Sequence, residues 1–362
     1  MSPQDLPADL GAARPWRPGK IFRWLALTLM PVLAALFGGG VILWAVGVDP
    51  LNYYGTVAGR GLLSPSGVQQ TLTRMAPLLF LAAGLIVAFR AGLWNLGVDG
   101  QFLLGAVAAA ASAPALAAIL PSGAAILVAF SLAALVGAAW AMLPALLKAY
   151  GGVNEIVSTL MMTFLGVSLA NLVVKLGLRD PETTVPQTRT LPVEDRLPRL
   201  FETTVSSGLL LGLFTIILVH LAMTRTAFGL RLRVMGVNPR AAIHAGLDLP
   251  WLTICAFALS AGLAGAAGAI EVLGIQGNVR ADWNPAYGLL VVPTVLLARL
   301  NGFAAVGFVL LLSVLSIGGE SAARRTGVPS AFTFVLVALV LVVLACSEYL
   351  DRRARNTPEG AA

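Results

Sequence analysis

The feature that most constrains this chain is a succession of long apolar runs with little charge between them. A helix needs about 20 mostly apolar residues to cross the hydrocarbon core of a bilayer. The sequence therefore predicts an all-α, polytopic membrane protein with about ten transmembrane helices, of which the short eighth and ninth could be broken or re-entrant. The predicted spans are 24–46, 72–89, 101–120, 123–147, 155–177, 206–223, 251–273, 287–300, 303–319 and 330–347.

The scarcity of charge supports the same interpretation. Only 11% of the 362 residues are Asp, Glu, Lys or Arg, whereas an ordinary globular protein has about 25%. Such a chain cannot cover its surface with charge, so the lipid bilayer is its expected surroundings. The net charge of +7 comes from residues scattered between the spans. Because they form no basic face with interleaved aromatics, we expect no nucleic-acid partner.

The distribution of basic residues predicts the orientation and the domain boundaries. With both termini in the cytoplasm, fourteen of the 24 Lys and Arg residues fall on the inner side and ten on the outer side, and this excess supports the orientation by the positive-inside rule. We expect a cytoplasmic tail at 1–23, a transmembrane domain at 24–347 and a cytoplasmic tail at 348–362. Within the domain, the proline-rich stretch 178–205 is expected to be an extracytoplasmic loop, and the basic stretch 224–250 a cytoplasmic loop.

The cytoplasmic loop contains a short helix that is well delimited at both ends. Asn238 can cap a helix, Pro239 suits the first helical position, and Gly246 suits the position after the end. A helix is therefore predicted at 239–245. It is either an ordinary helix at the membrane interface or one that inserts into a partner, because the small Ala241 and Ala242 allow close approach.

Three groups of polar residues lie in or beside the apolar spans. Glycines at 92, 97 and 100 indicate a broken segment, which either lines a passage at membrane depth or is a plain cytoplasmic loop. Glu155 either stands at the start of a helix, where the helix dipole favours a carboxylate, or it forms part of the wall of a polar pathway. Glu271 has either a pathway role or a structural one. The candidate pathway residues are Trp94, Asn95, Asp99, Gln101, Asn154, Glu155, Thr159 and Glu271.

The chain has little with which to catalyse a reaction. Two Cys and two His residues, far apart in sequence, suggest neither a disulfide nor a metal site. No Ser/His, His/Glu or Asp/Asp pair stands at useful spacing within the spans. The phosphate-binding pattern G-x-x-x-x-G-K-[ST] does not occur. We therefore expect no enzyme activity, no metal and no cofactor, and any ATP energy must come from another polypeptide.

Four stretches carry a family resemblance. "GLWNLGVDGQ" at 92–101, "NEIVSTLMM" at 154–162, "FGLRLRVMGVNPRAAIHAGL" at 228–247 and "SAGLAGAAGAIEVLG" at 260–274 resemble the membrane permease subunits of bacterial ATP-binding-cassette (ABC) importers for simple sugars and nucleosides. The resemblance implies a bacterial plasma-membrane location and three protein partners: an ATPase subunit, a second permease that is homologous or identical, and an extracytoplasmic substrate-binding protein. It also implies a coupling role for Gly236, Asn238, Pro239, Arg240, Ala241, Ala242 and Gly246.

The substrate is less defined by the sequence. The motif versions "NLGVDGQ" and "MGVNPRAA" look more like the nucleoside branch of this family than the ribose branch. A pathway with few charges suits a small neutral polar solute, whereas a nucleotide would require a cluster of Arg residues. The alternatives are the same kind of importer for ribose or another simple sugar, and a stand-alone secondary transporter. The latter needs buried carboxylates in several spans, and only Glu271 qualifies well.

Overall fold

The structure is a computed structural model that describes residues 18–201, 203–329, 331–336, 338–339, 342–343 and 346–347. The regular elements in this part of the chain are helices, which confirms the predicted all-α fold. The long helices are α1 (Pro18–Ala45), α3 (Pro65–Arg90), α4 (Val98–Ala117), α5 (Ser122–Trp140), α7 (Glu155–Leu176), α8 (Gly208–Arg225), α11 (Leu249–Glu271) and α13 (Gly302–Thr326). The shorter elements are α2 (Pro50–Ala58), α6 (Met142–Gly151), α9 (Ala227–Val237), α10 (Pro239–His244), α12 (Tyr287–Leu297), the 3₁₀ turn η2 (Val193–Asp195) and the π-helical turns η1 (Gly59–Leu63) and η3 (Val272–Gln276).

Among the described residues, seven helical stretches are long and apolar enough to cross a membrane. They match the second to seventh and the ninth predicted spans. Helix α1 contains an apolar stretch, Met30–Ala45, which lies in the first predicted span. Part of the tenth, 330–347, falls outside the described residues, and its described residues from 332 onward are helical.

The eighth and ninth predicted spans differ from each other in the structure. Helix α12 has 11 residues, enough for about half of the hydrocarbon core at 1.5 Å per residue, so the expected short eighth element is present. The ninth was expected to be short, which is wrong, because α13 has 25 residues. Its second half includes Ser313, Ser316 and Glu320, which shorten the apolar run in the sequence. The two serines are buried inside the bundle, where the helix needs no lipid-compatible side chains.

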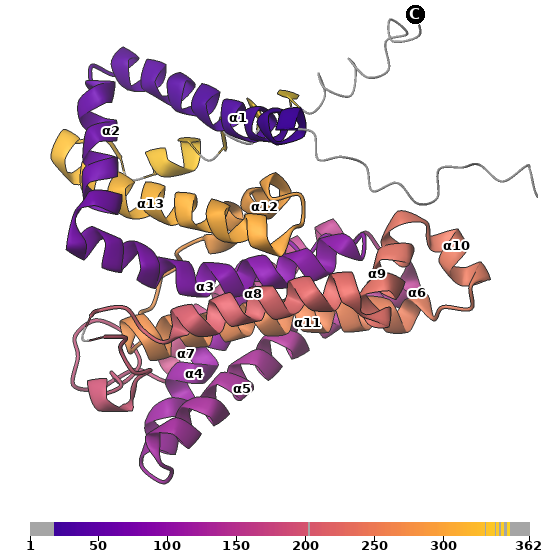
Figure 1. Cartoon of the computed structure of the whole chain (residues 1–362). Coiled ribbons are helices and arrows are strands. Elements are labelled where there is room, and N and C mark those ends of the chain that lie inside the picture. Colours follow the sequence, from indigo (N-terminus) through magenta and orange to yellow (C-terminus); the bar gives the residue numbers. More distant parts are fainter. Residues whose placement is uncertain are drawn as a thin grey trace, which may run out of the picture.

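The bundle is built around α3, α4 and α11, which hold most of the main hydrophobic cluster. Helix α11 packs against α3, α4 and α5, and α3 also runs beside α8 (Figure 1). The closest approach is made through glycine: a Cβ at Gly265 would overlap the backbone carbonyl of Ala133 and lie 3.1 Å from the Cα of Gly137. Small residues thus set the helix spacing, as is usual for helices packed in lipid.

The two ends of the bundle carry different structures, visible in Figure 1. At one end, which we call the loop end, residues 178–205 fold over the end of α11. Backbone N–H groups of Thr188, Leu191 and Leu197 donate hydrogen bonds of 2.8–2.9 Å to carbonyls in 273–279. At the other end, the α10 end, α10 projects from α9 beside the start of α11. The two stretches expected on opposite sides of the membrane therefore lie at opposite ends of the bundle.

Candidate functional site

The broken segment between α3 and α4 turns back into the bundle. Asn95 Nδ2 donates hydrogen bonds of 3.0 Å to Gln101 Oε1 and to Ser260 Oγ, and Gln101 Nε2 donates one of 3.1 Å to Asn95 Oδ1. All three side chains are fully buried. Ser260 lies in the middle of α11, which has the length of a membrane span. The segment therefore packs beside the middle of α11, and the two amides hold it together instead of lining the cavities described below.

A close glycine contact connects this segment to the base of the short helix. Gly92 has φ of +73°, and a Cβ there would lie 2.8 Å from the Cα of Gly236 in α9. A side chain at Gly236 would in turn meet the carbonyl of Arg90 at 2.5 Å. The guanidinium of Arg90 donates to the carbonyl of Leu300 at 2.9 and 3.2 Å. Gly236 therefore allows α9 to pack closely on the broken segment, and the exposed residues that follow Gly236 lie at the α10 end of the bundle.

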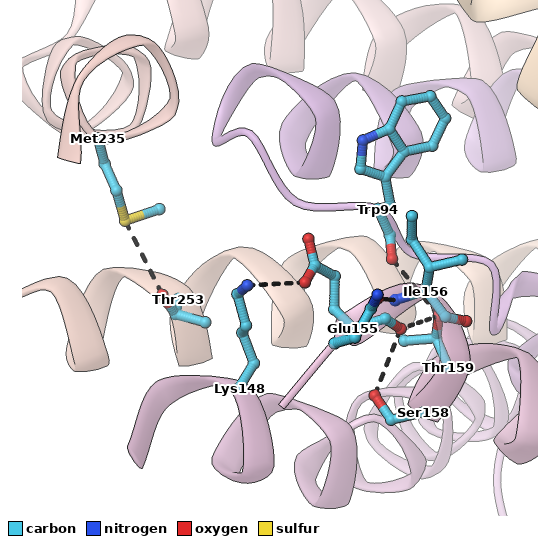
Figure 2. Close-up of polar contacts among 9 residues, drawn as sticks. Trp94, Lys148, Glu155, Ile156, Ser158, Thr159, Met235 and Thr253 are labelled. Atoms are coloured by element: carbon cyan, nitrogen blue, oxygen red, sulfur yellow. Dashed lines mark hydrogen bonds and ion pairs between the residues drawn. The ribbon is translucent and has the colours of Figure 1, made fainter. Parts of the chain in front are cut away.

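Thr159 fixes the same segment from α7. Its hydroxyl accepts a hydrogen bond of 3.1 Å from the backbone N–H of Leu96 and donates one of 2.6 Å to the carbonyl of Glu155. Trp94 has its carbonyl near Thr159, but Figure 2 shows its indole ring directed away from that hydroxyl. The ring packs on Phe89 with a centroid distance of 5.0 Å and remains exposed. The described contacts of Thr159 are therefore those of a structural anchor.

Asn154 and Glu155 form the start of α7. Asn154 Oδ1 accepts a hydrogen bond of 2.9 Å from the N–H of Ile156, which is a helix cap. Glu155 forms an ion pair of 2.7 Å with Lys148 at the end of α6 (Figure 2). A carboxylate at a helix start and an ammonium at a helix end are each stabilised by the helix dipoles. The geometry therefore matches the helix-start alternative.

Asp99 caps a helix to which it does not belong. Its Oδ1 accepts a hydrogen bond of 2.6 Å from the N–H of Gly288 in the first turn of α12. A Cβ at Gly288 would lie 2.9 Å from both carboxylate oxygens, so the contact requires glycine. The first N–H groups of a helix have no partner within it, and Asp99 supplies one inside the bundle. This cap positions the short α12 beside α4.

Two cavities open near the loop end. The first, of about 800 Å³, lies under the loop and is called the loop cavity. The second, of about 640 Å³, lies between α12 and α13 and is called the α12–α13 cavity. Arg74, Glu271 and Gln276 line both. Of the candidate pathway residues, Glu271 is on these walls.

The three residues that line both cavities belong to a hydrogen-bonded network drawn from five elements. Arg74 of α3 donates to Tyr287 OH of α12 at 3.1 Å and pairs with Glu320 Oε1 of α13 at 3.3 Å. Tyr287 OH donates to Glu271 Oε2 at 3.4 Å, and Gln276 Nε2 of η3 donates to Glu271 Oε1 at 3.2 Å. The buried carboxylate of Glu271, at the end of α11, is therefore partnered on both oxygens. The π-helical turn that follows it is a feature frequent at functional sites.

Sequence reasoning identified Glu271 and missed the rest of this network. Arg74 stands inside a predicted span, where a basic residue among apolar ones is a signal that could have been used. Glu320 lay just beyond the predicted end of the ninth span. Tyr287 is the first residue of the predicted eighth span, and its uncharged side chain gave no signal of a polar network.

The short helix is present as predicted, one residue shorter at its end. Asn238 Oδ1 accepts a hydrogen bond of 3.0 Å from the N–H of Ala241, Pro239 occupies the first turn, and Gly246 has φ of +73°. Asn238, Pro239, Arg240, Ala241 and Gly246 are exposed.

One expectation about this helix needs correction. Ala242 was expected to be a close-contact position for a partner, but it is fully buried in a cluster with Leu232, Met235 and Leu252. It fixes α10 to its own chain. The large exposed apolar residues here are Val237, the last residue of α9, which is 87% exposed, and Ile243 of α10, which is 60% exposed. The sequence did not reveal this because a helix of under two turns has too few residues for its buried face to be recognised.

Comparisons with known proteins extend over nearly the whole chain. Residues 67–344 match the family described as branched-chain amino acid transport system / permease component. A glucose ABC transporter permease protein of Haloferax volcanii is 32% identical, with 93% of this chain and 94% of that protein covered. A guanosine ABC transporter permease protein of Bacillus subtilis is 28% identical, with 89% and 94% covered. A nucleoside ABC transporter permease protein of Lactococcus lactis subsp. cremoris is 24% identical, with 88% and 90% covered.

No solved structure matches the chain. The family match covers more than half of the sequence and includes the seven spans apart from the first residues of α3. The predicted membership of the ABC importer permeases is thereby confirmed. The chain belongs to the family of permease components of the branched-chain amino acid transport system, and it is a multi-pass membrane subunit of an ABC transporter rather than an enzyme.

Proposed function

We propose that this permease forms the translocation pathway of an importer for a nucleoside, driven by a separate ATPase subunit. The observation that carries the proposal is α10, a short helix with fixed ends at the bundle end opposite the two cavities. It exposes Ile243, and the exposed Val237 at the end of α9 comes just before it in the chain. An exposed apolar contact on a rigid projecting helix is suited to a protein groove.

The packing of α10 supports a coupling role. Ala242 anchors the helix in a cluster shared with α9 and α11, and Thr253 of α11 donates to the sulfur of Met235 at 3.9 Å (Figure 2). Gly236 touches the broken segment at Gly92. A movement of α10 therefore acts directly on α11 and on the segment before α4.

The other partners are assigned to the remaining surfaces. An extracytoplasmic binding protein docks on the loop end, where 178–205 is tied by backbone hydrogen bonds to 273–279. A second permease subunit, identical or homologous, completes the pathway across the lipid-facing side. The protein resides in a bacterial plasma membrane, with 24–347 as its membrane domain.

The orientation has a direct test. We expect both tails, 1–23 and 348–362, and the loop 224–250 to be cytoplasmic, because basic residues are retained on that side. Reporter domains fused after Arg225 and Arg353 should report the cytoplasm, and a fusion after Thr190 should report the exterior. An exterior signal after Arg225 would contradict both the topology and the placement of α10.

The substrate assignment depends on the chemistry of the cavities. Trp283 and Phe334 line the α12–α13 cavity and offer aromatic surface for a base. Similar proteins include a guanosine and a nucleoside permease. The second candidate is a hexose, which the 32% identical glucose permease favours.

Transport by the reconstituted complex tests this function. The permease, its ATPase and its binding protein should accumulate tritiated guanosine in proteoliposomes only when ATP reaches the ATPase. ¹⁴C-glucose, measured in the same vesicles, is the comparison. Accumulation of glucose alone would contradict the nucleoside assignment and support the hexose. Accumulation without ATP would contradict the proposal that a separate ATPase subunit drives uptake.

A further inference from the structure

The α12–α13 cavity presents hydrogen-bonding capacity that the protein does not use. A guanidinium has five N–H groups, and the described bonds of Arg74 engage it with Tyr287 and Glu320. Among the described residues, Glu320 Oε2 has no hydrogen-bond partner, and Glu320 is partly exposed on the cavity wall. A donor and an acceptor side by side can hold two neighbouring hydroxyl groups.

A second observation concerns Thr333, which comes after α13 in the chain and lines the same cavity. Thr333 is 6% exposed, lines the cavity, and its Oγ1 has no hydrogen-bond partner. Buried hydroxyls in native proteins are normally satisfied by protein, water or a bound molecule. Thr333 therefore indicates that a polar occupant belongs in this cavity.

The charges of the cavity restrict that occupant. Two guanidinium groups, Arg74 and Arg324, and two carboxylates, Glu271 and Glu320, are on its walls, so the formal charges balance. A phosphate would need an excess of cationic donors. A neutral polyhydroxylated ring can both donate and accept here, and a volume of about 640 Å³ accommodates it.

We propose that the α12–α13 cavity is a solute-binding subsite for the vicinal hydroxyls of a sugar ring, either the ribose of a nucleoside or a free hexose. Arg74 and Glu320 hold the hydroxyls from one wall and Thr333 from the other, with Trp283 providing an apolar face. This inference deepens the proposed function and rests on it. It adds a specific binding site within the permease, separate from the one on the binding protein.

The test measures solute binding to the permease–ATPase complex in lipid nanodiscs, without the binding protein. Tritiated guanosine and tritiated glucose are the two probes, measured by equilibrium dialysis, and they distinguish the ribosyl from the hexose source. Glu320→Gln removes the charged acceptor and is expected to weaken binding about tenfold or more. Thr333→Val keeps the shape, removes the hydroxyl and is expected to weaken binding about fivefold. Ser313→Ala is the matched control, because Ser313 is also buried and without a partner but does not line the cavity.

The outcomes separate this inference from the function on which it rests. Weaker binding of the same probe in both cavity variants, with Ser313→Ala unchanged, supports the subsite. If the wild-type complex transports a probe when its binding protein is present, yet binds neither probe in nanodiscs, the subsite proposal is wrong and the proposed function is unaffected. Equal affinity in wild type, Glu320→Gln and Thr333→Val would overturn it as well. Failure of the complete importer to transport either probe would instead refute the proposed substrate class.

Discussion

Replacing Ala241 with tryptophan is expected to reduce ATP-driven uptake by about 30-fold or more while leaving the permease in the membrane. Ala241 is exposed on α10, next to the anchored Ala242. A bulky ring forced into a tightly packed contact costs about 2 kcal/mol, which is about 30-fold in affinity. Uptake and substrate-stimulated ATP hydrolysis in proteoliposomes should fall together, and pull-down of the ATPase subunit should weaken.

Two further variants show whether the size of the side chain at position 241 causes the loss of uptake. Ala241→Ser keeps the volume nearly unchanged and should retain uptake. Ala242→Trp alters a side chain buried within this chain, so it should lower the amount of folded permease rather than uncouple an intact one. Normal uptake by Ala241→Trp would mean that α10 lies on the membrane surface without docking, and the coupling proposal would fail.

Replacing Gly265 with alanine is expected to destabilise the protein by about 3 kcal/mol, at the upper end of typical overpacking costs. In most helices this change stabilises by about 0.5–1 kcal/mol, because glycine loses more backbone freedom on folding. Here the new methyl group would overlap the carbonyl of Ala133. That atom belongs to the backbone of α5, so it cannot rotate aside, and α5 and α11 must separate. Thermal unfolding of the purified permease in nanodiscs should show a lower midpoint.

Gly262 provides the matched control on the same helix. A Cβ there would lie 3.4 Å from the carbonyl of Ala134 and 3.7 Å from the Cβ of Ala138, which are near-ordinary contacts. Gly262→Ala should therefore leave the unfolding midpoint unchanged or raise it slightly. If both variants unfold like the wild type, the α5–α11 contact is looser than the structure shows, and glycine at 265 is not required for packing.

The sequence by itself determined the class of the protein and most of its helices. Apolar runs of membrane length predicted the spans because the cost of burying charge in lipid is a local property of the chain. The ends of α10 were predicted for a similar reason. Asn238, Pro239 and Gly246 act on neighbouring backbone groups, and such short-range effects can be read from neighbouring residues alone. The match to ABC importer motifs likewise needed only the linear order of residues.

Only the tertiary structure decided what the polar residues do. Asn95 meets Ser260 across 165 positions of sequence, and Arg74 meets Glu320 across 246. A sequence shows that a buried amide or guanidinium needs a partner, but many distant residues could provide one. The folded bundle selects among them because helix packing fixes which side chains come within hydrogen-bond distance. It made Asn95 and Gln101 partners of each other, placed Ala242 inside its own chain, and assembled the cavity wall from helices that no local pattern connects.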